Sequence, residues 1–522
     1  MVAQSAGSNV KHSKINNSLE IKNLLKEHFP VDQIENLNHS RIPLNPHKKF
    51  HQNQSSHLGG VHDFSFFQMV SDLKERLNKT RYTAPLEHAG FEYGFNHDAL
   101  KAVVDFWQNK YDFESREQYM NQFPHFKTVI QGLDMHFIHI KPEVPKGVKV
   151  LPLLICHGWP GSIREFYRLI PLLTAPQKDP EFVFELVVPS LPGFGFSQGA
   201  SKTGLGATQI GAVMANLMER LGHKQFYVQG GDWGSIITSA MATLYPDTVL
   251  GYHTNFPQVS SMKTNIRTVV GSLWPSMFVN SEFVHKLYPL KRRFGELMKE
   301  TGYLHIQATK PDTVGIGDSP AGLAAYILEK FSSATDLSFR KLDDGGLTNK
   351  FTYTDLIDNL MVYWVSNSAT TAVRIYSESF CKAAFALKMD SIPTTVPTAA
   401  AKFPNEISYM TDAQLMDKYP NLLQSTEMPR GGHFAAFEEP ELLSQDIISA
   451  VKNGKPEGRR GRQGGNKFIF LQEPYGAVGT GDKSNDVWGY VNRASLIPNY
   501  DFKLQINTVV MDDYIFRELT CK

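Results

Sequence analysis

The stretch Gln229-Gly230-Gly231-Asp232-Trp233-Gly234-Ser235 follows the strand-like residues Phe226–Val228 and leads into a run of small and apolar residues. Gly230 and Gly234 flank a sharp strand-to-helix turn, which lifts one side chain above a sheet and beside a helix N-terminus. The pattern is that of a nucleophile elbow, with aspartate where serine hydrolases carry serine. We therefore predict that Asp232 makes the first covalent bond to the substrate.

A carboxylate in this position limits the reactions that the site can catalyse. A serine that opened an epoxide would leave a stable ether, whereas an aspartate leaves an ester that an activated water can cleave at its carbonyl carbon. An enzyme built on Asp232 can therefore release its product and turn over.

The composition is that of an ordinary soluble globular protein, with 42% apolar residues, 20% charged residues and a formal net charge of +1. The 522 residues are enough for one large α/β core with appended segments. The near-neutral charge argues against a nucleic-acid partner, which normally requires a basic surface. The three cysteines are too few and too scattered for a disulfide framework or a zinc site, so we expect no metal and a reducing compartment.

Membrane insertion and secretion are not expected from the chain as written. No run of about 18 apolar residues occurs, and the first residues lack the basic region and apolar stretch of a signal peptide. Both expectations depend on the start of the chain being complete.

Strand-like and helical segments alternate from about residue 125. His125–Ile130 and Met135–Ile140 alternate apolar and polar residues around Gln131-Gly132-Leu133-Asp134, which predicts a hairpin that opens the sheet. Later strand-like runs are separated by amphipathic segments such as Gly206–Leu221, and a last helix is expected over Pro440–Lys452. This pattern predicts an α/β fold whose mostly parallel sheet is covered by helices on both faces. The later strands are expected at Val150–Cys156, Phe184–Val188, Phe226–Val228, Val249–His253, Thr394–Thr398 and Leu422–Met428.

The remaining segments divide the chain into six parts. Apolar positions with helical spacing, such as Leu73 and Trp107, predict an N-terminal helical module. After residue 255 the sequence becomes helical and aromatic, which we interpret as a lid over the carboxyl edge of the sheet, where α/β proteins bind ligands. The parts are a polar, mostly disordered lead-in at 1–60, the helical module at 61–124, the first part of the core at 125–255, the lid at 256–385, the second part of the core at 386–452, and a basic linker with a C-terminal tail at 453–522.

A histidine follows the last expected strand, in the segment Arg430-Gly431-Gly432-His433-Phe434. This late position is where hydrolases with an elbow place their base, after the nucleophile and the acid in chain order. Gly431 and Gly432 allow the loop to turn tightly. A lone histidine is more often structural, but its place after the elbow predicts that His433 is the general base.

The base needs a carboxylate that orients the imidazole and stabilises its cation. Glu406 lies 27 residues before His433 and follows a strand candidate, so it is the best-placed acid. Asp412 is a weaker alternative. Glu438 and Glu439 come just after the histidine and are expected to begin the next helix, where negative charge favours the dipole.

The segment His157-Gly158-Trp159-Pro160-Gly161 ends the strand Val150–Cys156, where a second oxyanion donor belongs. We predict that the backbone amides of Trp159 and Trp233 face the carbonyl oxygen of the ester on Asp232. A packing role for the Trp159 side chain is compatible with this donation.

Four motifs in one order resemble the microsomal epoxide hydrolase family, which includes the insect juvenile hormone epoxide hydrolases. The resemblance covers about residues 62–452 and is highly specific. It rests on GGDWGS at the elbow, HGWPGS from residue 157, GYLHIQATKPDTVG from residue 302 followed by SPAGLAAYILEKFS, and RGGHFAAFEEPELL from residue 430.

The resemblance implies an N-terminal epoxide hydrolase module, an α/β-hydrolase core, a helical lid and no cofactor. It also implies that Tyr303 and Tyr376 are lid acids that hold the epoxide oxygen. Ring opening develops an alkoxide, and phenols can donate hydrogen bonds at neutral pH without being ionised. The expected substrate is a small lipophilic epoxide, which reacts with water to give a vicinal diol.

Two rival functions stay open at this point. A haloalkane dehalogenase shares the aspartate elbow and the ester intermediate, but it needs donors suited to a halide rather than to an alkoxide. A binding protein for hydrophobic epoxides or terpenoids would keep the pocket without catalysis, although such a protein would be free to lose Asp232, Glu406 or His433.

Location and substrate are expected from kinship alone. The family is microsomal, which implies the endoplasmic reticulum and a peripheral membrane association, whereas the chain itself is compatible with the cytosol. Xenobiotic arene or alkene oxides in detoxification, fatty epoxides and juvenile hormone all fit a lipophilic pocket. Aromatic residues of the expected lid favour such a pocket, although they could equally form the lid core: Trp274, Phe278, Phe283, Tyr363 and Trp364.

Overall fold

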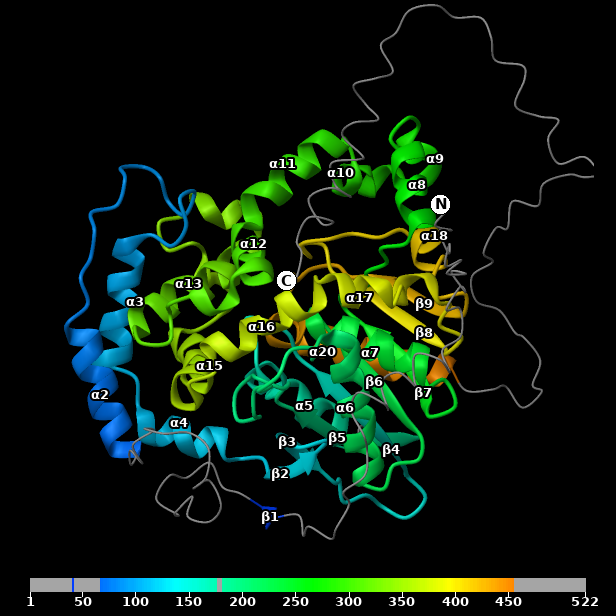
Figure 1. The fold of residues 1–522 in the computed structure, drawn as a ribbon, viewed down its shortest axis with the longest axis horizontal. Helices are drawn as coiled ribbons and strands as arrows, with labels where there is room; N and C mark the ends of the chain where they lie inside the picture. The colour runs from blue at the N-terminus through cyan, green and yellow to red at the C-terminus, as the bar shows by residue number, and fades with distance from the viewer. Residues whose placement is uncertain (1–39, 42–65, 176–180, 455–522) are drawn as a thin grey trace, which may run out of the picture. The chain divides into compact units, whose positions relative to one another are not determined.

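The structure is a computed structural model that describes residues 40–41, 66–175 and 181–454. Most of the predicted lead-in and nearly all of the predicted C-terminal part lie outside the described residues. The hydrolase core, the N-terminal helices and the helical insertion lie within them (Figure 1).

The described strands form one sheet in the order β1-β2-β3-β5-β4-β6-β7-β8-β9. The pairs β1–β2, β2–β3 and β3–β5 are antiparallel, and every later pair is parallel. This confirms the predicted mostly parallel sheet. The strands are β1 (Ser40–Arg41), β2 (His125–Ile130), β3 (Leu133–Ile140), β4 (Lys149–Cys156), β5 (Phe182–Pro189), β6 (Phe226–Gly230), β7 (Val249–Thr254), β8 (Thr398–Lys402) and β9 (Leu422–Glu427).

The predicted hairpin is present, with a shorter turn than expected. Gln131 and Gly132 both have positive φ, +50° and +80°, as a two-residue turn of the I′ type requires. Leu133 and the residue after it pair with the first strand and extend β3. The hairpin does not open the sheet, because Ser40 of β1 pairs with Lys127.

Alternate residues of β4 pack against helices on opposite faces of the sheet. Leu153 and Ile155 pack in a core with α5 (Leu169–Thr174) and α20 (Pro440–Asn453), where Leu443 is fully buried. Leu154 faces the other core, with α6 (Ala207–Arg220) and α7 (Trp233–Leu244). The sheet is therefore covered on both faces, as predicted.

The N-terminal helices are α2 (Phe66–Asn78), α3 (His97–Asn109) and α4 (Phe113–Met120). Leu73, Val103 and Trp107 are buried, which confirms the helical spacing found in the sequence. Both α2 and α3 contact α13 (Pro320–Ser333), so this module packs against the insertion between β7 and β8.

The insertion between β7 and β8 is helical throughout and contains no described strand. Its longest helices, α13 and α15 (Tyr353–Ser366), contact each other and bury Leu323, Ile327 and Leu360. Its other α-helices are α8 (Met262–Gly271), α9 (Pro275–Phe278), α10 (Val284–Leu287), α11 (Leu290–Glu300), α12 (Gly302–Thr309), α14 (Leu347–Lys350), α16 (Ala369–Ser379) and α17 (Lys382–Ala386).

The predicted strand Thr394–Thr398 is wrong in position, because the strand β8 begins where it ends. Prolines at 393 and 397 lack the N–H that a ladder requires. The strand uses Ala399, Ala400 and Ala401, which have low intrinsic strand preference but are fully enclosed between β7 and β9. Burial between two neighbouring strands outweighs local propensity here.

Candidate active site

Asp232 sits at the predicted elbow between β6 and α7. Its φ of +50° and ψ of −129° lie outside the ordinary allowed regions, which marks strain held by the surrounding structure. A Cβ on Gly230 would overlap the backbone of Gly234, and a Cβ on Gly234 would overlap the carbonyl of Cys156. The two glycines are therefore required for the turn that presents Asp232.

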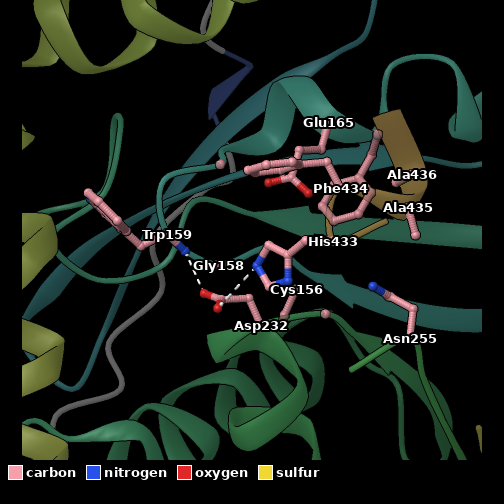
Figure 2. A pocket seen from close by; sticks show the side chains of 13 residues that line it. Cys156, Gly158, Trp159, Glu165, Asp232, Asn255, His433, Phe434, Ala435 and Ala436 are labelled. Atoms are coloured by element: carbon pink, nitrogen blue, oxygen red, sulfur yellow. Dashed lines mark hydrogen bonds and ion pairs between the residues drawn. The ribbon is translucent and has the colours of Figure 1, made fainter. Parts of the chain in front are cut away.

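The loop after β4 contacts this carboxylate directly. The backbone N–H of Trp159 donates a hydrogen bond of 2.8 Å to Asp232 Oδ1 (Figure 2). A Cβ on Gly158 would overlap the Asp232 side chain, so only glycine lets the loop approach so closely. The structure thus places one of the two predicted oxyanion donors on the carboxylate. The amide of Trp233 follows Asp232 at the start of α7, and its role stays a prediction.

His433 lies on the other side of the same carboxylate, with Nε2 3.4 Å from Asp232 Oδ2 (Figure 2). The loop turns at Gly431, whose φ is +102°, as the sequence predicted. The His433 amide donates to the carbonyl of Ala334, just after α13. Residues of the core and of the insertion therefore both position the imidazole of His433.

Glu406 is the partner of the imidazole. Its Oε1 lies 2.7 Å from His433 Nδ1 and also accepts the amide of Ile407 at 2.7 Å. The loops that carry the two side chains are joined by a hydrogen bond of 3.1 Å from Asn405 N to Gly431 O. Glu406 is 3% exposed at its side chain, so its charge is shielded from water.

The other carboxylates weighed in the sequence have different partners. Asp412 binds Lys402 Nζ and Ser425 Oγ, away from the imidazole. Glu438 ends the short helix α19 (Ala435–Glu438), and its carboxylate accepts the amides of Gly432 and Phe434 on both sides of His433. The expectation that Glu438 begins a helix is therefore wrong: it holds the histidine loop. Glu439 binds Arg430 and Lys350 instead.

The electrostatic setting of His433 favours its cation. Burial lowers the pKa of the imidazole, but the charges of Glu406 and Asp232 and their hydrogen bonds outweigh burial and raise the pKa well above its usual value. The proton on His433 is therefore coupled to the charge on Asp232.

The two tyrosines implied by the family resemblance come together over the elbow. The ring of Tyr303, on α12, stacks on Trp159 with centroids 5.0 Å apart. Tyr376, on α16, meets Trp233 edge-on at 4.8 Å and Tyr303 at 6.1 Å. Both tyrosines thus lie beside the tryptophans that flank Asp232.

Both phenols remain protonated at neutral pH. Burial, with a smaller contribution from the Asp232 charge, raises the pKa of Tyr303 above its ordinary value. Burial, Tyr303 and Asp232 raise the pKa of Tyr376 in the same direction. The pair can therefore donate hydrogen bonds to an oxygen that gains negative charge.

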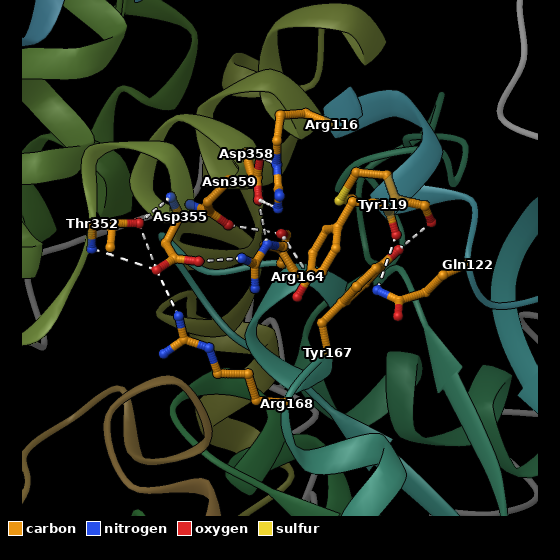
Figure 3. Close-up of polar contacts among 12 residues, drawn as sticks. Arg116, Tyr119, Gln122, Arg164, Tyr167, Arg168, Thr352, Asp355, Asp358 and Asn359 are labelled. Atoms are coloured by element: carbon orange, nitrogen blue, oxygen red, sulfur yellow. Dashed lines mark hydrogen bonds and ion pairs between the residues drawn. The ribbon is translucent and has the colours of Figure 1, made fainter. Parts of the chain in front are cut away.

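A buried ionic network fixes the loop that carries Trp159 (Figure 3). Arg164 Nε donates to Asp358 Oδ2 at 2.8 Å, and Arg164 Nη2 donates to Asp355 Oδ1 at 2.5 Å, both on α15. Tyr363 donates to the carbonyl of Gly161 at 2.7 Å. No short motif in the sequence pointed to this network, because its members lie almost 200 residues apart.

The aromatic residues expected in the insertion do not line the cavity beside Asp232. Trp274 is exposed, Phe278 and Phe283 pack in a separate cluster around Tyr288, and Trp364 packs against the main core. They therefore give no evidence about the substrate. The aromatic rings around the elbow are Trp159, Trp233, Tyr303, Tyr376, Phe256 and Phe380.

Among the described residues, one group could supply three metal ligands: His139, Glu185 and His223. Glu185 Oε1 lies 2.7 Å from His139 Nε2 and 3.3 Å from His223 Nε2, so the group is already paired internally. The ammonium of Lys141, 3.8 Å from the same oxygen, disfavours an added cation. We interpret the group as a polar cluster centred on Glu185. Within the described part of the chain, no helix is long and apolar enough to cross a bilayer.

Comparison with known proteins decides the family. Residues 67–166 match the family described as epoxide hydrolase N terminus, and residues 152–298 match the alpha/beta hydrolase fold. Juvenile hormone epoxide hydrolase 2 of Ctenocephalides felis is 57% identical over 387 residues, which are 74% of this chain and 83% of that protein. The chain belongs to the epoxide hydrolase family.

Other relatives of this epoxide hydrolase agree. Epoxide hydrolase 1 of Sus scrofa is 46% identical over 385 residues, 72% of this chain and 85% of that protein. The crystal structure of juvenile hormone epoxide hydrolase from Bombyx mori is 49% identical, with a TM-score of 0.74, and covers 75% of this chain and 93% of that one. The α/β-hydrolase fold and the family resemblance are thereby confirmed, and neither rival function is favoured.

Proposed function

We propose that this enzyme converts lipophilic epoxides to vicinal diols through a covalent ester on Asp232. The observation that carries the proposal is the position of this carboxylate. Its Oδ2 faces His433 Nε2 at 3.4 Å, and its Oδ1 accepts the amide of Trp159, whose ring stacks on Tyr303. Nucleophile, base and phenolic donors therefore surround one point at the carboxyl edge of the sheet.

In the first half of the reaction, a carboxylate oxygen of Asp232 attacks one epoxide carbon and the carbon–oxygen bond of the ring breaks. Tyr303 and Tyr376 donate hydrogen bonds to the departing oxygen, which takes a proton from one of the phenols. The product of this half is a hydroxyalkyl ester. The buried phenols serve as acids because they hold their protons until the alkoxide forms.

In the second half, water attacks the ester carbonyl carbon while His433 accepts one proton of that water. The amides of Trp159 and Trp233 stabilise the negative oxygen of the tetrahedral intermediate. The bond between the carbonyl carbon and the alkyl oxygen then breaks, and that oxygen takes the proton left on the new carboxyl group. The proton on His433 restores the phenol.

Ester formation also prepares the base. The charge of Asp232 helps to raise the pKa of His433, and this charge disappears when the carboxylate becomes an ester. The pKa of the imidazole therefore falls at the point where a neutral base is needed. Glu406 keeps its charge and stabilises the cation that forms next.

Single-turnover reaction in ¹⁸O-labelled water tests the proposal. With enzyme in excess over a styrene-type epoxide, one turnover should place label in the Asp232 side chain, which mass spectrometry of its peptide would detect, and leave the diol unlabelled. Diol formation with no label at this position would show that water attacks the epoxide directly. Tight epoxide binding without diol formation would indicate a binding protein that lacks catalysis. Chloride release from a chloroalkane would indicate a haloalkane dehalogenase.

We propose juvenile-hormone-like terpenoid epoxides as the favoured substrate class. The relative from Ctenocephalides felis carries that name and shares more identity with this chain than Epoxide hydrolase 1 of Sus scrofa, 57% against 46%. A competition panel of a juvenile hormone, a fatty epoxide and an arene oxide tests this, because ratios of kcat/KM measure discrimination directly. Equal ratios across the panel would favour general detoxification.

We further propose that the enzyme works at the surface of the endoplasmic reticulum membrane. Exposed apolar side chains recur on α8, α9 and α11, including Met277 at 79% and Trp274 at 59% exposure. Residues 262–300 carry seven basic and three acidic side chains, which suits an anionic lipid surface. The proposed apolar face comprises the exposed side chains Met262, Ile266, Val270, Leu273, Trp274, Met277, Leu297 and Met298.

Vesicle sedimentation tests the location. The enzyme should bind vesicles that contain phosphatidylserine more strongly than pure phosphatidylcholine vesicles. The double variant Trp274→Glu/Met277→Glu should lose this binding and keep its activity on a water-soluble epoxide. Tyr93→Glu, at a position 83% exposed outside the apolar face, is the matched control. Equal vesicle binding by all three proteins would exclude this face as the lipid contact.

A further inference from the structure

Glu165 is a carboxyl group inside the active site that neither half of the proposed reaction uses. It lies on the short helix η1 (Ile163–Phe166), a few residues after the loop that binds Asp232. Its side chain lines the same cavity as Asp232 and His433, and Figure 2 shows it pointing toward them. Both groups are close enough for their charges to affect the pKa of Glu165.

The loop makes room for this carboxyl group. A Cβ on Gly161 would overlap Glu165 Oε1, so the carboxyl group occupies the space that a side chain at position 161 would fill. The carbonyl of Gly161 is held by Tyr363, and Arg164 is held by the buried carboxylates of α15. Both neighbours of Glu165 in the loop are therefore fixed, and its direction is fixed with them.

The shared cavity has the size of a water molecule. Its free volume of about 10 Å³ is about the least that can hold one water molecule. Its polar walls are Asp232, His433, Glu165 and Asn255, and its apolar walls include Phe434. A water in this cavity would have the several polar partners that an ordered water requires.

We propose that Glu165 is the second residue that holds the hydrolytic water, with His433, for attack on the ester. This inference rests on the proposed ester mechanism. The water donates one hydrogen to His433 Nε2 and the other to a carboxyl oxygen of Glu165. These two hydrogen bonds orient a lone pair of the water oxygen toward the carbonyl carbon of Asp232. The water oxygen forms a bond to that carbon and its first proton passes to His433. Glu165 gains and loses no proton.

The protonation of Glu165 suits this task. Burial raises its pKa to about 8, against a smaller opposing effect of the His433 cation, so the group is neutral at physiological pH. A neutral carboxyl group can accept a hydrogen bond from water without competing with His433 for the proton. It also adds no second negative charge beside Asp232 before the ester forms.

A structural role for Glu165 predicts different behaviour. The sequence Ser162-Ile-Arg-Glu165 fits a capping box, and the Ser162 amide does hydrogen-bond the Glu165 carboxyl group. A cap alone would contribute to stability and would not distinguish the two halves of the reaction. Because a carboxyl group has two oxygens, the cap leaves one oxygen for the water.

Rapid-quench single turnovers with Glu165→Gln and Glu165→Leu separate these roles. A neutral carboxamide reproduces the hydrogen bonds of a neutral carboxyl group, so the glutamine variant should hydrolyse the ester within about threefold of wild type. The leucine variant should form the ester at the wild-type rate and hydrolyse it on the order of 10²-fold more slowly. Mass spectrometry should then find the ester on Asp232 during steady turnover.

Gly161→Ala provides a second variant that keeps the carboxyl group but displaces it from the cavity. It should show the same slow ester hydrolysis as the leucine variant. Wild-type ester hydrolysis in both variants would overturn the proposal, as would equal slowing of both halves. Failure of the underlying mechanism is distinguishable, because His433→Gln would then form no ester at all.

Discussion

Asp232 Oδ2 and His433 Nε2 lie 3.4 Å apart, so the nucleophile and the base of the proposed reaction are in direct contact. The contact ties the two halves of the cycle together. While Asp232 is charged, it favours the imidazolium; once it is esterified, His433 is released to act as a base.

Replacing His433 by glutamine should separate the halves. Asp232 should still be alkylated, because its attack on the epoxide needs no proton acceptor, but hydrolysis of the ester should slow by about 10³-fold or more. Incubation with an epoxide should add the mass of one substrate to the peptide that contains Asp232. An unmodified peptide would contradict the assignment of the nucleophile.

Glu406→Gln should lower the pKa of His433, because the charge of Glu406 is one of the effects that raise it. Ester hydrolysis should then follow a pH profile displaced toward lower pH, with a maximal rate reduced by about 10²-fold or more because the imidazolium loses its partner. Single-turnover rates from pH 5 to 9 measure the displacement. Asp412→Asn is the control, since Asp412 binds Lys402 and Ser425, and its profile should match wild type.

The tyrosine pair should act on the other half of the reaction. Tyr303→Phe and Tyr376→Phe should each slow alkylation of Asp232 by roughly 10- to 100-fold, because each removes one of two donors to the developing alkoxide. Ester hydrolysis should stay near the wild-type rate. Tyr326→Phe, whose ring also contacts Trp159 but lies outside the pair, should leave alkylation unchanged. A slower hydrolysis step in either member of the pair would count against the assignment.

The elbow and the late histidine were predictable because their chemistry is local. The glycines around Asp232 and the loop before His433 are required by backbone geometry, which short motifs record. Tyr303 and Tyr376 were different: only the family resemblance separated them from the other tyrosines, since nothing in their local sequence marks a donor. Their positions depend on how α12 and α16 pack over the elbow.

The residues that the sequence did not reveal depend on contacts over long separations. Glu438 holds the histidine loop by accepting two amides, but its sequence position resembles a helix start. The local sequence of Glu165 indicates only a capping residue, whereas the fold brings it into the same cavity as His433. The prediction misplaced strand β8, because its alanines adopt strand structure through burial in the sheet and not through local propensity.

Asp358→Ala should destabilise the whole enzyme. This fully buried carboxylate accepts hydrogen bonds from Arg116, Arg164 and Tyr111, and its loss would leave the buried Arg164 with Asp355 alone and the partly buried Arg116 without its carboxylate. We expect the free energy of unfolding to fall by about 3–5 kcal/mol, measured by urea denaturation. Asp98→Ala breaks an exposed pair with Lys101 and should cost less than about 1 kcal/mol. Similar losses in the two variants would argue against a buried network.

The stability of Glu165→Gln relative to wild type should rise with pH. In the folded enzyme the pKa of Glu165 is raised to about 8 by burial, against an ordinary value of 4.5. Between these values the folded state holds a proton that the unfolded chain releases, so each step up in pH favours unfolding. The stabilisation is complete below pH 4.5 and is lost as pH rises through 8.

Glutamine cannot ionise and escapes this loss. Urea midpoints at pH 5, 6.5 and 8 should therefore move in favour of the variant as pH increases, while at pH 5 the two proteins stay closest. His433, Asp232 and the Ser162 amide face Glu165 in both proteins, so their own effects largely cancel in the difference. A difference that stays constant across this range would mean that Glu165 is already ionised in the folded enzyme, and its carboxylate would then compete with His433 for the proton of the water.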